Sequence, residues 1–436
     1  MKALCVVSCP IDTFSGYGAR SRDFVKSLIK AKDNEWDIKI LPQRWGDCPW
    51  NFLSQDDPLR QRFIGSLDPN NKPDIWIQIT VPNEFQAIGQ YNIGISAGIE
   101  TTIYPGEFIE GSNRMDLNLV SSNHSKNVAL NSQFEKRDKN QQVVGQLKLE
   151  KPMEVLFEGL DLDKYNKNPQ NSGLLKDIHE DFCFLFTGHW LPGAFGEDRK
   201  NTAVLVKTFL ETFKGSSKKK PALILKSNQV NYSLLDRENL IKQINRIRSK
   251  FTDSLPNIYL LHGEMTDDEM NQLNNDNKVK AFVSFTKGEG YGRPLVEAAI
   301  TGKPIITTNW SGHLDFLHPD YNVLIGGELK NVHKSAANQF LLKDSQWFNI
   351  NTDIASKAMK DMHKHYKQYL EKSRKQTQYL KDNWSFDKMT EKMNGLLPKV
   401  ETAPQMQTLK LPKLKKKTVK TELPKLKLPK LKKVKI

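Results

Sequence analysis

The stretch Lys280–Gly312, KAFVSFTKGEGYGRPLVEAAITGKPIITTNWSG, predicts the fold of this chain more strongly than any other segment. It begins in a short apolar run, Val279–Phe285, which is rich in β-favouring residues and typical of a buried parallel strand. The glycine turn Gly288–Gly292 follows, and Pro294 then stands where the first turn of a helix tolerates proline. Gly302 marks the end of that helix, and the apolar run PIITTN after it predicts another strand. The order strand, glycine turn, helix, strand indicates an α/β protein with parallel strands.

The glycine turn is a candidate phosphate site. Backbone N–H groups in such a turn point toward a helix N-terminus, where anions are favoured. Glu289 lies in the turn, and Glu297 lies on the predicted helix eight residues later. Glycines and glutamates are common at such places in any α/β protein, so the turn alone leaves its function open.

Glu289 and Glu297, with GYGRPL between them and GKPII after them, resemble the donor-binding signature of glycosyltransferase family 4 (glycosyl transferases group 1) and its GT-B relatives. The resemblance covers nearly all of residues 1–395. It implies an α/β protein with two Rossmann-like domains that face a central cleft, and a C-terminal helix that crosses back onto the first domain. We therefore expect an acceptor-side domain over 1–165, a donor-binding domain over 166–370, crossover helices over 371–398 and a disordered basic tail over 399–436.

The resemblance also implies a chemistry: retaining, metal-independent transfer of a sugar from a nucleotide sugar, with a UDP-sugar as the expected donor and no cofactor. Glu297 would hold the donor ribose, and Glu289 would hold the sugar. Lys200, with Arg199 or Lys226, would stabilise the departing diphosphate, although family members separate the arginine and the lysine by four or five residues and here they are adjacent. The remaining donor contacts expected in the second half are Gly290, Tyr291, Gly292 and Arg293.

A second glycine turn, SGYG, follows the first predicted strand near the N-terminus. In the family the equivalent turn approaches the donor diphosphate or the acceptor, so Gly16 and Gly18 are candidate donor contacts; a plain turn closing a strand–helix unit is the alternative. Arg20 and Arg22 could serve an anion, but exposed helix arginines are the default expectation. Glu100, at the end of the predicted strand YNIGISAG, occupies roughly the place of a family histidine that contacts the transferred sugar, and is a candidate catalytic residue.

An aromatic loop, LPQRWGDCPWNF, carries Trp45, Trp50 and Phe52. Clustered aromatic side chains can stack on sugars or bases, but packing under the loop explains them equally well. Farther along, His124 is more typical of a structural or surface histidine than of a base. His313 and Asp315 could line the donor pocket.

Composition places limits on location. No apolar run approaches the roughly 18–20 residues that a membrane span needs, and MKALCVVSCP lacks the apolar core of a signal peptide. The four cysteines show neither metal-ligand spacing nor a disulfide framework. These features predict a cytoplasmic protein, in the host cytoplasm if the protein is viral, without a metal site.

Positive charge is concentrated at the C-terminus. The chain has a net charge of +15, and residues 401–436 contain twelve lysines and two glutamates, a net +10. The motif LPKLK occurs there three times, and its prolines disfavour a continuous helix. Clustered lysines favour a polyanion, with nucleic acid as the first expectation and an anionic membrane surface as the second. A passive solubilising tail is the alternative.

The segments SGYG, the Trp-Gly loop and AGIETT resemble most closely the family 4-like transferases of tailed bacteriophages. Together with the lysine tail, this favours a hydroxymethylated base in phage DNA as the acceptor. A lipid or cell-surface glycan, with the tail docked on a membrane, is the second hypothesis. A catalytically inactive nucleic-acid-binding protein is the third. The sequence leaves the oligomeric state open.

Overall fold

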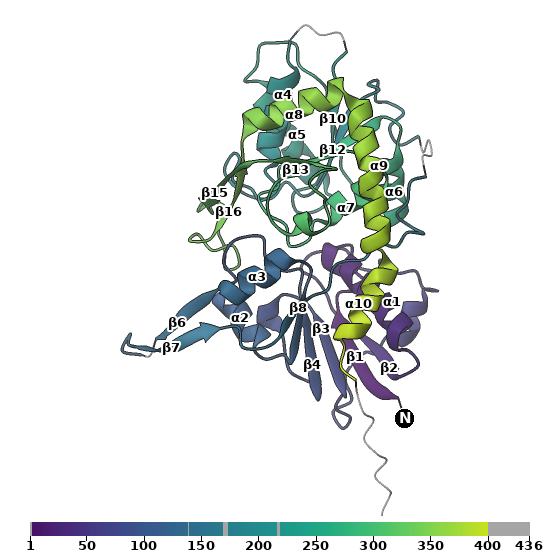
Figure 1. Cartoon of the computed structure of the whole chain (residues 1–436), viewed down its shortest axis with the longest axis vertical. Coiled ribbons are helices and arrows are strands. Elements are labelled where there is room, and N and C mark those ends of the chain that lie inside the picture. Colours follow the sequence, from purple (N-terminus) through teal and green to yellow (C-terminus); the bar gives the residue numbers. More distant parts are fainter. Residues whose placement is uncertain (1, 138, 169–172, 216–218, 400–436) are drawn as a thin grey trace, which may run out of the picture. The chain divides into compact units, whose positions relative to one another are not determined.

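Two parallel β-sheets form the core of the protein (Figure 1). The computed structural model describes residues 2–137, 139–168, 173–215 and 219–399. The first sheet has the order β2-β1-β3-β4-β5-β8 and the second the order β11-β10-β9-β12-β13-β14. The second order is that of dinucleotide-binding domains, and the first follows the flavodoxin-like pattern.

The strands agree with the apolar runs of the sequence. The first sheet consists of β1 (Ala3–Cys9), β2 (Trp36–Pro42), β3 (Ile75–Ile79), β4 (Tyr91–Ile95), β5 (Leu117–Val120) and β8 (Met153–Val155). The second consists of β9 (Cys183–Thr187), β10 (Ala222–Lys226), β11 (Ile258–Leu261), β12 (Val279–Val283), β13 (Ile305–Thr308) and β14 (Val323–Ile325). All neighbouring strands within each sheet run parallel. Central strands such as β10 are buried along their whole length, which explains their unbroken hydrophobicity.

Helices connect these strands, and several of them begin at a residue whose side chain caps the first turn. They are α1 (Gly16–Lys32), α2 (Gly106–Ser112), α3 (Asn123–Asn131), α4 (Thr202–Phe213), α5 (Leu234–Arg248), α6 (Asp267–Asn275) and α7 (Arg293–Ile300), with short 3₁₀ turns η1 (Pro58–Arg62), η2 (Pro82–Glu84) and η3 (Gly312–Asp315). Ser122 caps α3, and Thr266 forms a reciprocal capping box with Glu269 on α6. Gly302 follows α7 with φ of +81°, a conformation that favours glycine at a helix end.

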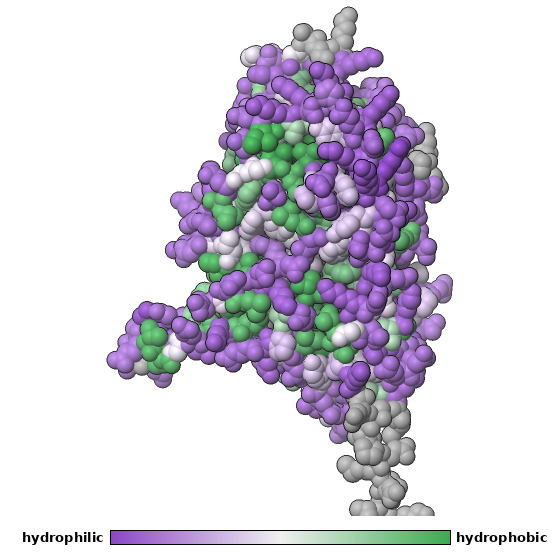
Figure 2. Space-filling model, viewed as in Figure 1, coloured by the Kyte–Doolittle hydropathy of each residue, from purple (hydrophilic) through white to green (hydrophobic). Residues whose placement is uncertain are grey.

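Two antiparallel hairpins were not predicted from the sequence. One pairs β6 (Gln133–Arg137) with β7 (Val143–Lys148), and the other pairs β15 (Gly327–Asn331) with β16 (Gln346–Ile350). Strands β6 and β7 lie apart from both sheets, and hydrophobic residues are visible on this hairpin (Figures 1 and 2). Val143 and Val144 are 54% and 64% exposed. Strands β6, β7 and β15 are mostly exposed, so they lack the apolar alternation by which strands are recognised.

The C-terminal helices return to the first half of the chain, as the resemblance predicted. They are α8 (Thr352–Lys364), α9 (Tyr366–Asn383) and α10 (Phe386–Leu396). Helix α9 packs on α7, and α10 packs on α1, where the hydroxyl groups of Ser27 and Thr390 lie 2.8 Å apart. Met389 and Met393 are buried in the core that contains the first sheet. These three helices are separated by interruptions at His365 and at Trp384.

Among the described residues, no helix is both long enough and apolar enough to cross a lipid bilayer. The expected basic tail lies, from residue 400 onward, outside the described part of the chain. The domain limits at 165 and 370 remain predictions.

The contact between α10 and the segment after β8 is tight at Gly159. A Cβ atom on this residue would lie 2.7 Å from the Cβ of Met389 and 2.9 Å from the Cα of Phe386. We expect Gly159→Ala to displace α10 and to lower the free energy of unfolding by about 1–3 kcal/mol, measured by chemical denaturation. Gly395→Ala is the control, because Gly395 also lies on α10 and a Cβ there would meet no atom of another described segment within 4 Å. Equal stability of both variants would contradict this account.

Candidate active site

Three segments meet beyond the end of β12: the glycine turn that follows this strand, the loop before α4, and the segment after β4. The backbone N–H of Lys287 donates to the carbonyl of Arg199 at 2.7 Å. A Cβ on Gly288 would lie 2.0 Å from the carbonyl oxygen of Glu100, and one on Gly290 would lie 2.1 Å from that of Ala97. Glycine is therefore required at both positions for the close approach of the two halves. Ligands of open α/β sheets gather at such strand ends.

A buried ionic cluster lies at this junction. The ammonium of Lys200 and the guanidinium of Arg199 both contact Glu289, the latter with Nη1 3.2 Å from Oε2. Arg199 Nε also lies 3.7 Å from a carboxylate oxygen of Glu100. The backbone N–H of Glu289 donates to the hydroxyl of Ser311 at 2.9 Å. The structure thus brings the four candidate catalytic residues Glu289, Lys200, Arg199 and Glu100 together.

Burial and ion pairing act in opposite directions on the charged groups of this cluster. Burial by itself would raise the pKa of Glu289, but Lys200 and Arg199 outweigh it and hold that pKa at about 2. Burial lowers the pKa of Lys200 against the opposing effect of Glu289, whereas Glu100 and Glu289 outweigh burial at Arg199 and raise its pKa. Two buried cations held by one carboxylate form an arrangement that can stabilise an anionic leaving group.

A second buried network surrounds Arg293. Its Nη1 lies 2.7 Å from the carboxylate of Asp23 on α1 and 3.6 Å from that of Glu158, and its Nε donates to Glu297 at 2.8 Å. Glu158 also pairs with Arg20 at 3.3 Å. The side chain of Arg293 therefore faces carboxylates from both halves of the chain, and its predicted contact with the donor depends on its backbone.

Glu297 is buried beside this arginine, and burial raises its pKa to about 7 even though Arg293 lowers it. The pKa of Glu297 is higher in the folded state than the unfolded value of 4.5. Between pH 4.5 and about 7, the folded state therefore binds more protons at this group than the unfolded state does. Stability contributed by this group is present below about pH 4.5 and is lost as the pH rises through 7.

We therefore expect Glu297→Gln to gain stability relative to the parent protein as the pH rises from about 4.5 to 7. The gain should approach about 1.4 kcal/mol per pH unit. Urea denaturation at several pH values measures it. Glu328→Gln, at a side chain 68% exposed, is the control. A stability difference that does not vary with pH would show that Glu297 titrates normally.

The remaining donor candidates differ in what surrounds them. The Tyr291 side chain is buried and its hydroxyl donates to the carbonyl of Glu158 at 2.8 Å, so its ring belongs to the core. Gly292 has φ of +104° at the start of α7. A Cβ on Gly18 would lie 2.3 Å from the carbonyl oxygen of Thr13, which gives this glycine a packing role. Space is open beside Gly16. Donor binding by these residues remains a prediction.

Lys226 lies at the end of β10, in a separate pocket of about 500 Å³ that also includes Tyr232, His262 and Glu269. Its ammonium donates to the carbonyl of Gly263, and burial lowers its pKa. The structure does not place Lys226 in direct contact with Glu289.

His189 was missed in the sequence, although its ring lies near enough to Lys226 and to the ionic cluster to be influenced by their charges. Burial, together with the charges of Lys200, Arg199 and Lys226, lowers the pKa of His189 to about 4. A neutral imidazole therefore lies among three cations. The signal that could have revealed it is its position directly after Gly188, at the carboxyl end of a predicted strand.

Lys287 was also missed, although it is fully buried. Its ammonium contacts Glu197 at 3.1 Å and lies 4.8 Å from the ring centroid of Trp347. Together with the bond from its backbone to Arg199, this fixes the loop that presents Arg199 and Lys200. A lysine two residues after the apolar run Val279–Phe285 was the available signal.

The expectation that Arg20 and Arg22 lie on an exposed helix face is wrong. Both are buried, with 4% and 5% exposure. Arg22 donates to the carbonyls of Ile11 and Thr13 and lies 3.4 Å from the ring centroid of Phe52. These arginines satisfy backbone carbonyls and Glu158, which are distant in sequence, so helical periodicity could not reveal their burial.

Two histidines near the cluster carry buried nitrogens without a partner among the described residues: Nε2 of His124 and Nδ1 of His313. His313 bonds through its other nitrogen to the carbonyl of Thr308 at 2.7 Å. Burial lowers the pKa of both residues. Asp315 accepts from the backbone N–H of Asn123 at 2.7 Å, so it faces the start of α3.

In the aromatic loop, one side chain is packed inside the protein and another lines a pocket. Phe52 packs against Phe14 with centroids 4.9 Å apart. Trp45 stacks on Tyr17 at 4.1 Å and lines a surface pocket. The Tyr17 hydroxyl accepts a hydrogen bond from the backbone N–H of Ala97 at 3.0 Å, which connects this loop to the segment around Glu100.

No family model matches the sequence, and no curated protein matches it. Solved structures do share its fold. Sucrose-phosphate synthase from Thermosynechococcus elongatus is 9% identical with a TM-score of 0.58, covering 91% of this chain and 98% of its own. A glycosyltransferase from Rickettsia africae ESF-5 is 12% identical with a TM-score of 0.58, covering 90% and 97%. HepE (Alr3699) from Anabaena, in complex with UDP and glucose, is 12% identical with a TM-score of 0.53, covering 90% and 98%. The chain therefore has the GT-B fold that its sequence predicted.

Proposed function

We propose that the protein is a glycosyltransferase that transfers a sugar from a nucleotide sugar, with a UDP-sugar as donor, to a hydroxyl group. The observation that carries this proposal is the buried cluster of Glu289, Lys200 and Arg199 at the strand ends of a GT-B fold. HepE, which shares this fold, is itself bound to UDP and glucose in one structure and to UDP-glucose in another.

In the proposed reaction, the bond between the anomeric carbon and the diphosphate oxygen breaks, and the acceptor oxygen bonds to the same face of that carbon. The configuration is thereby retained. The acceptor proton passes to an oxygen of the departing diphosphate, so no histidine base is needed. Lys200 and Arg199 supply positive charge where the leaving group becomes more negative, in a site where buried charges act strongly. This division of roles requires no metal ion.

Glu289 has two roles in this proposal. It holds Lys200 and Arg199 in position before the donor binds. When these two side chains turn to the diphosphate, one carboxylate oxygen of Glu289 accepts a hydrogen bond from a sugar hydroxyl. Glu297 binds the ribose hydroxyls, because its carboxylate lies one turn into α7, behind the glycine turn. The backbone N–H groups of Gly290–Arg293 contact the diphosphate.

The acceptor that the sequence favours is a hydroxymethylated base in DNA, as in phage DNA. The support is the charge of residues 401–436, with twelve lysines against two glutamates, which suits a polyanion. A lipid or surface glycan remains the competing acceptor, with the lysines on an anionic membrane.

Calorimetric titration of the full chain with UDP, GDP, UDP-glucose and other sugar nucleotides tests the donor. We expect at least one UDP-sugar to bind at micromolar to millimolar concentration. Binding of no sugar nucleotide would overturn the proposed function. Incubation of the bound donor with hydroxymethylated DNA or with lipid vesicles, followed by mass spectrometry, then distinguishes the acceptors.

A further inference from the structure

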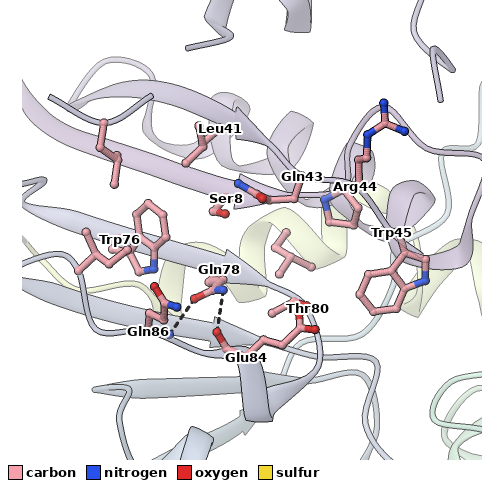
Figure 3. Close-up of a pocket in the computed structure, with 14 residues that line it drawn as sticks. Ser8, Leu41, Gln43, Arg44, Trp45, Trp76, Gln78, Thr80, Glu84 and Gln86 are labelled. Carbon is pink, nitrogen blue, oxygen red and sulfur yellow. Dashed lines mark hydrogen bonds between the residues drawn. The ribbon is translucent and has the colours of Figure 1, made fainter. Parts of the chain in front are cut away.

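A pocket of about 260 Å³ opens beside the carboxyl ends of β1, β2 and β3, in the first half of the chain. Trp76 and Trp45 lie at its two ends, with Gln43 and Gln78 between them (Figure 3). Apolar side chains complete its walls: Pro10, Leu41, Leu67, Ile79 and Ile88. The proposed donor site uses none of these residues.

One wall of the pocket is held rigidly by hydrogen bonds. The amide of Gln78 donates to the carbonyl of Glu84 at 3.0 Å and accepts from the backbone N–H of Gln86 at 2.9 Å (Figure 3). The hydroxyl of Thr80 donates to the carboxylate of Glu84. The segment η2 is therefore fixed to β3, and the pocket is formed before any ligand arrives.

Other polar groups in the pocket are unused. The indole nitrogen of Trp76 is buried and has no partner among the described residues, and it can only donate. No hydrogen bond joins the side-chain amide of Gln43 or Gln86 to another described residue. A buried donor without a partner is unfavourable, so a ligand with an acceptor atom at this point would be stabilised by pairing with it.

A short path of contacts joins the pocket to the ionic cluster. Trp45 stacks on Tyr17, whose hydroxyl accepts from Ala97, and the carbonyl of Ala97 lies against Gly290, next to Glu289. Because Tyr17 and Ala97 lie between the pocket and Glu289, a group bound in the pocket would not itself carry the reacting hydroxyl.

We propose that this pocket binds an unstacked base of a single-stranded or opened nucleic-acid acceptor, next to the base that receives the sugar. The proposal rests on the proposed function for its reacting centre. A base presents two apolar faces, which suit Leu41, Leu67 and Ile88, and a polar edge, which suits two amides and an indole N–H. A glycan ring has hydroxyls around its whole rim, and the apolar walls would leave several of them unpaired. The positively charged chain, at +15, also suits a nucleic acid.

Binding of a labelled single-stranded 12-nucleotide DNA carrying 5-hydroxymethylcytosine, followed by fluorescence anisotropy, tests the proposal. Trp45→Ala should weaken binding about 5- to 150-fold through lost stacking. Trp76→Phe, which removes the indole donor, and the exposed double change Gln43→Ala/Gln86→Ala should each weaken it roughly 5-fold or more. Trp384→Phe is the matched control, because its buried ring nitrogen also lacks a partner while its ring packs against Phe157 and Phe316.

Calorimetry with UDP on the same proteins separates this proposal from the proposed function. We expect UDP to bind all pocket variants as it binds the parent protein. Unchanged DNA affinity in the Gln43→Ala/Gln86→Ala and Trp45→Ala variants would overturn the pocket assignment. Displacement of the bound DNA by oligosaccharides but not by nucleosides would overturn it too. Loss of DNA affinity in these variants, in a protein that binds no sugar nucleotide, would keep the base pocket and overturn the transferase.

Discussion

Lys200→Met will lower kcat by about 100- to 10,000-fold if the proposed transferase activity is present, with a much smaller change in the KM for the nucleotide sugar. The reason is that charge on the diphosphate increases as the glycosidic bond breaks, and a buried cation stabilises the transition state more than the bound donor. Methionine keeps the length and apolar stem of lysine, so the loss isolates the charge.

The measurement is initial rates over a range of donor concentrations. Lys207→Met is the matched control, because Lys207 lies on α4, directly after the loop that carries Lys200. Its side chain is 46% exposed and lies 3.4 Å from Glu211. A kcat within threefold of the parent value in Lys200→Met would assign the leaving-group role elsewhere, with Arg199 as the next residue to test. Loss of folding is detected separately by thermal denaturation.

The sequence predicted those parts of the site that are local in the chain. The glycine turn, the helix at Pro294 and both flanking strands follow from apolar periodicity and from the special conformations of glycine and proline. The proximity of Glu289 to Lys200 and Arg199 was predicted from the resemblance to a family, because some ninety residues separate them in the sequence. No propensity or periodicity encodes such a distance.

The second network could not be predicted at all. Arg293 and Asp23 lie 270 residues apart and meet only because α7 faces α1 across the two halves. Glu158, which follows β8 in the chain, is a buried carboxylate between Arg20 and Arg293. Burial of an ion pair depends on the whole tertiary structure, whereas a hydrophobic strand is recognisable from a few residues.

Glu289 and Glu297 therefore belong to different ionic networks, which have different roles. Glu289 contacts cations of the second half, and its network can exchange partners with an anionic ligand. Glu297 contacts Arg293, which in turn contacts Asp23 and Glu158 of the first half. A donor that binds Glu297 must compete with Arg293, so donor binding and the contact between the halves are coupled through this arginine.

Arg293→Met is expected to lower the free energy of unfolding by about 3–5 kcal/mol, the usual cost of leaving buried charges without their partner. Asp23 and Glu297 would then lose the cation that they share, while Glu158 would keep its contact with Arg20. The pKa of Glu297, which Arg293 lowers, would rise. Because the folded state would take up protons more readily than the unfolded state, the loss should be largest at neutral pH and should shrink as the pH falls toward 4.

Chemical denaturation between pH 4 and pH 8 measures this loss. Arg293→Lys keeps the charge but loses the planar fork that reaches several carboxylates, so an intermediate loss is expected. Arg246→Met, at an exposed position on α5, should stay within about 0.5 kcal/mol of the parent protein. A loss in Arg293→Met that is equally large at every pH would point to the packing of the arginine stem as its cause. Loss of the charge would instead leave repulsion among the carboxylates, and that repulsion varies with pH.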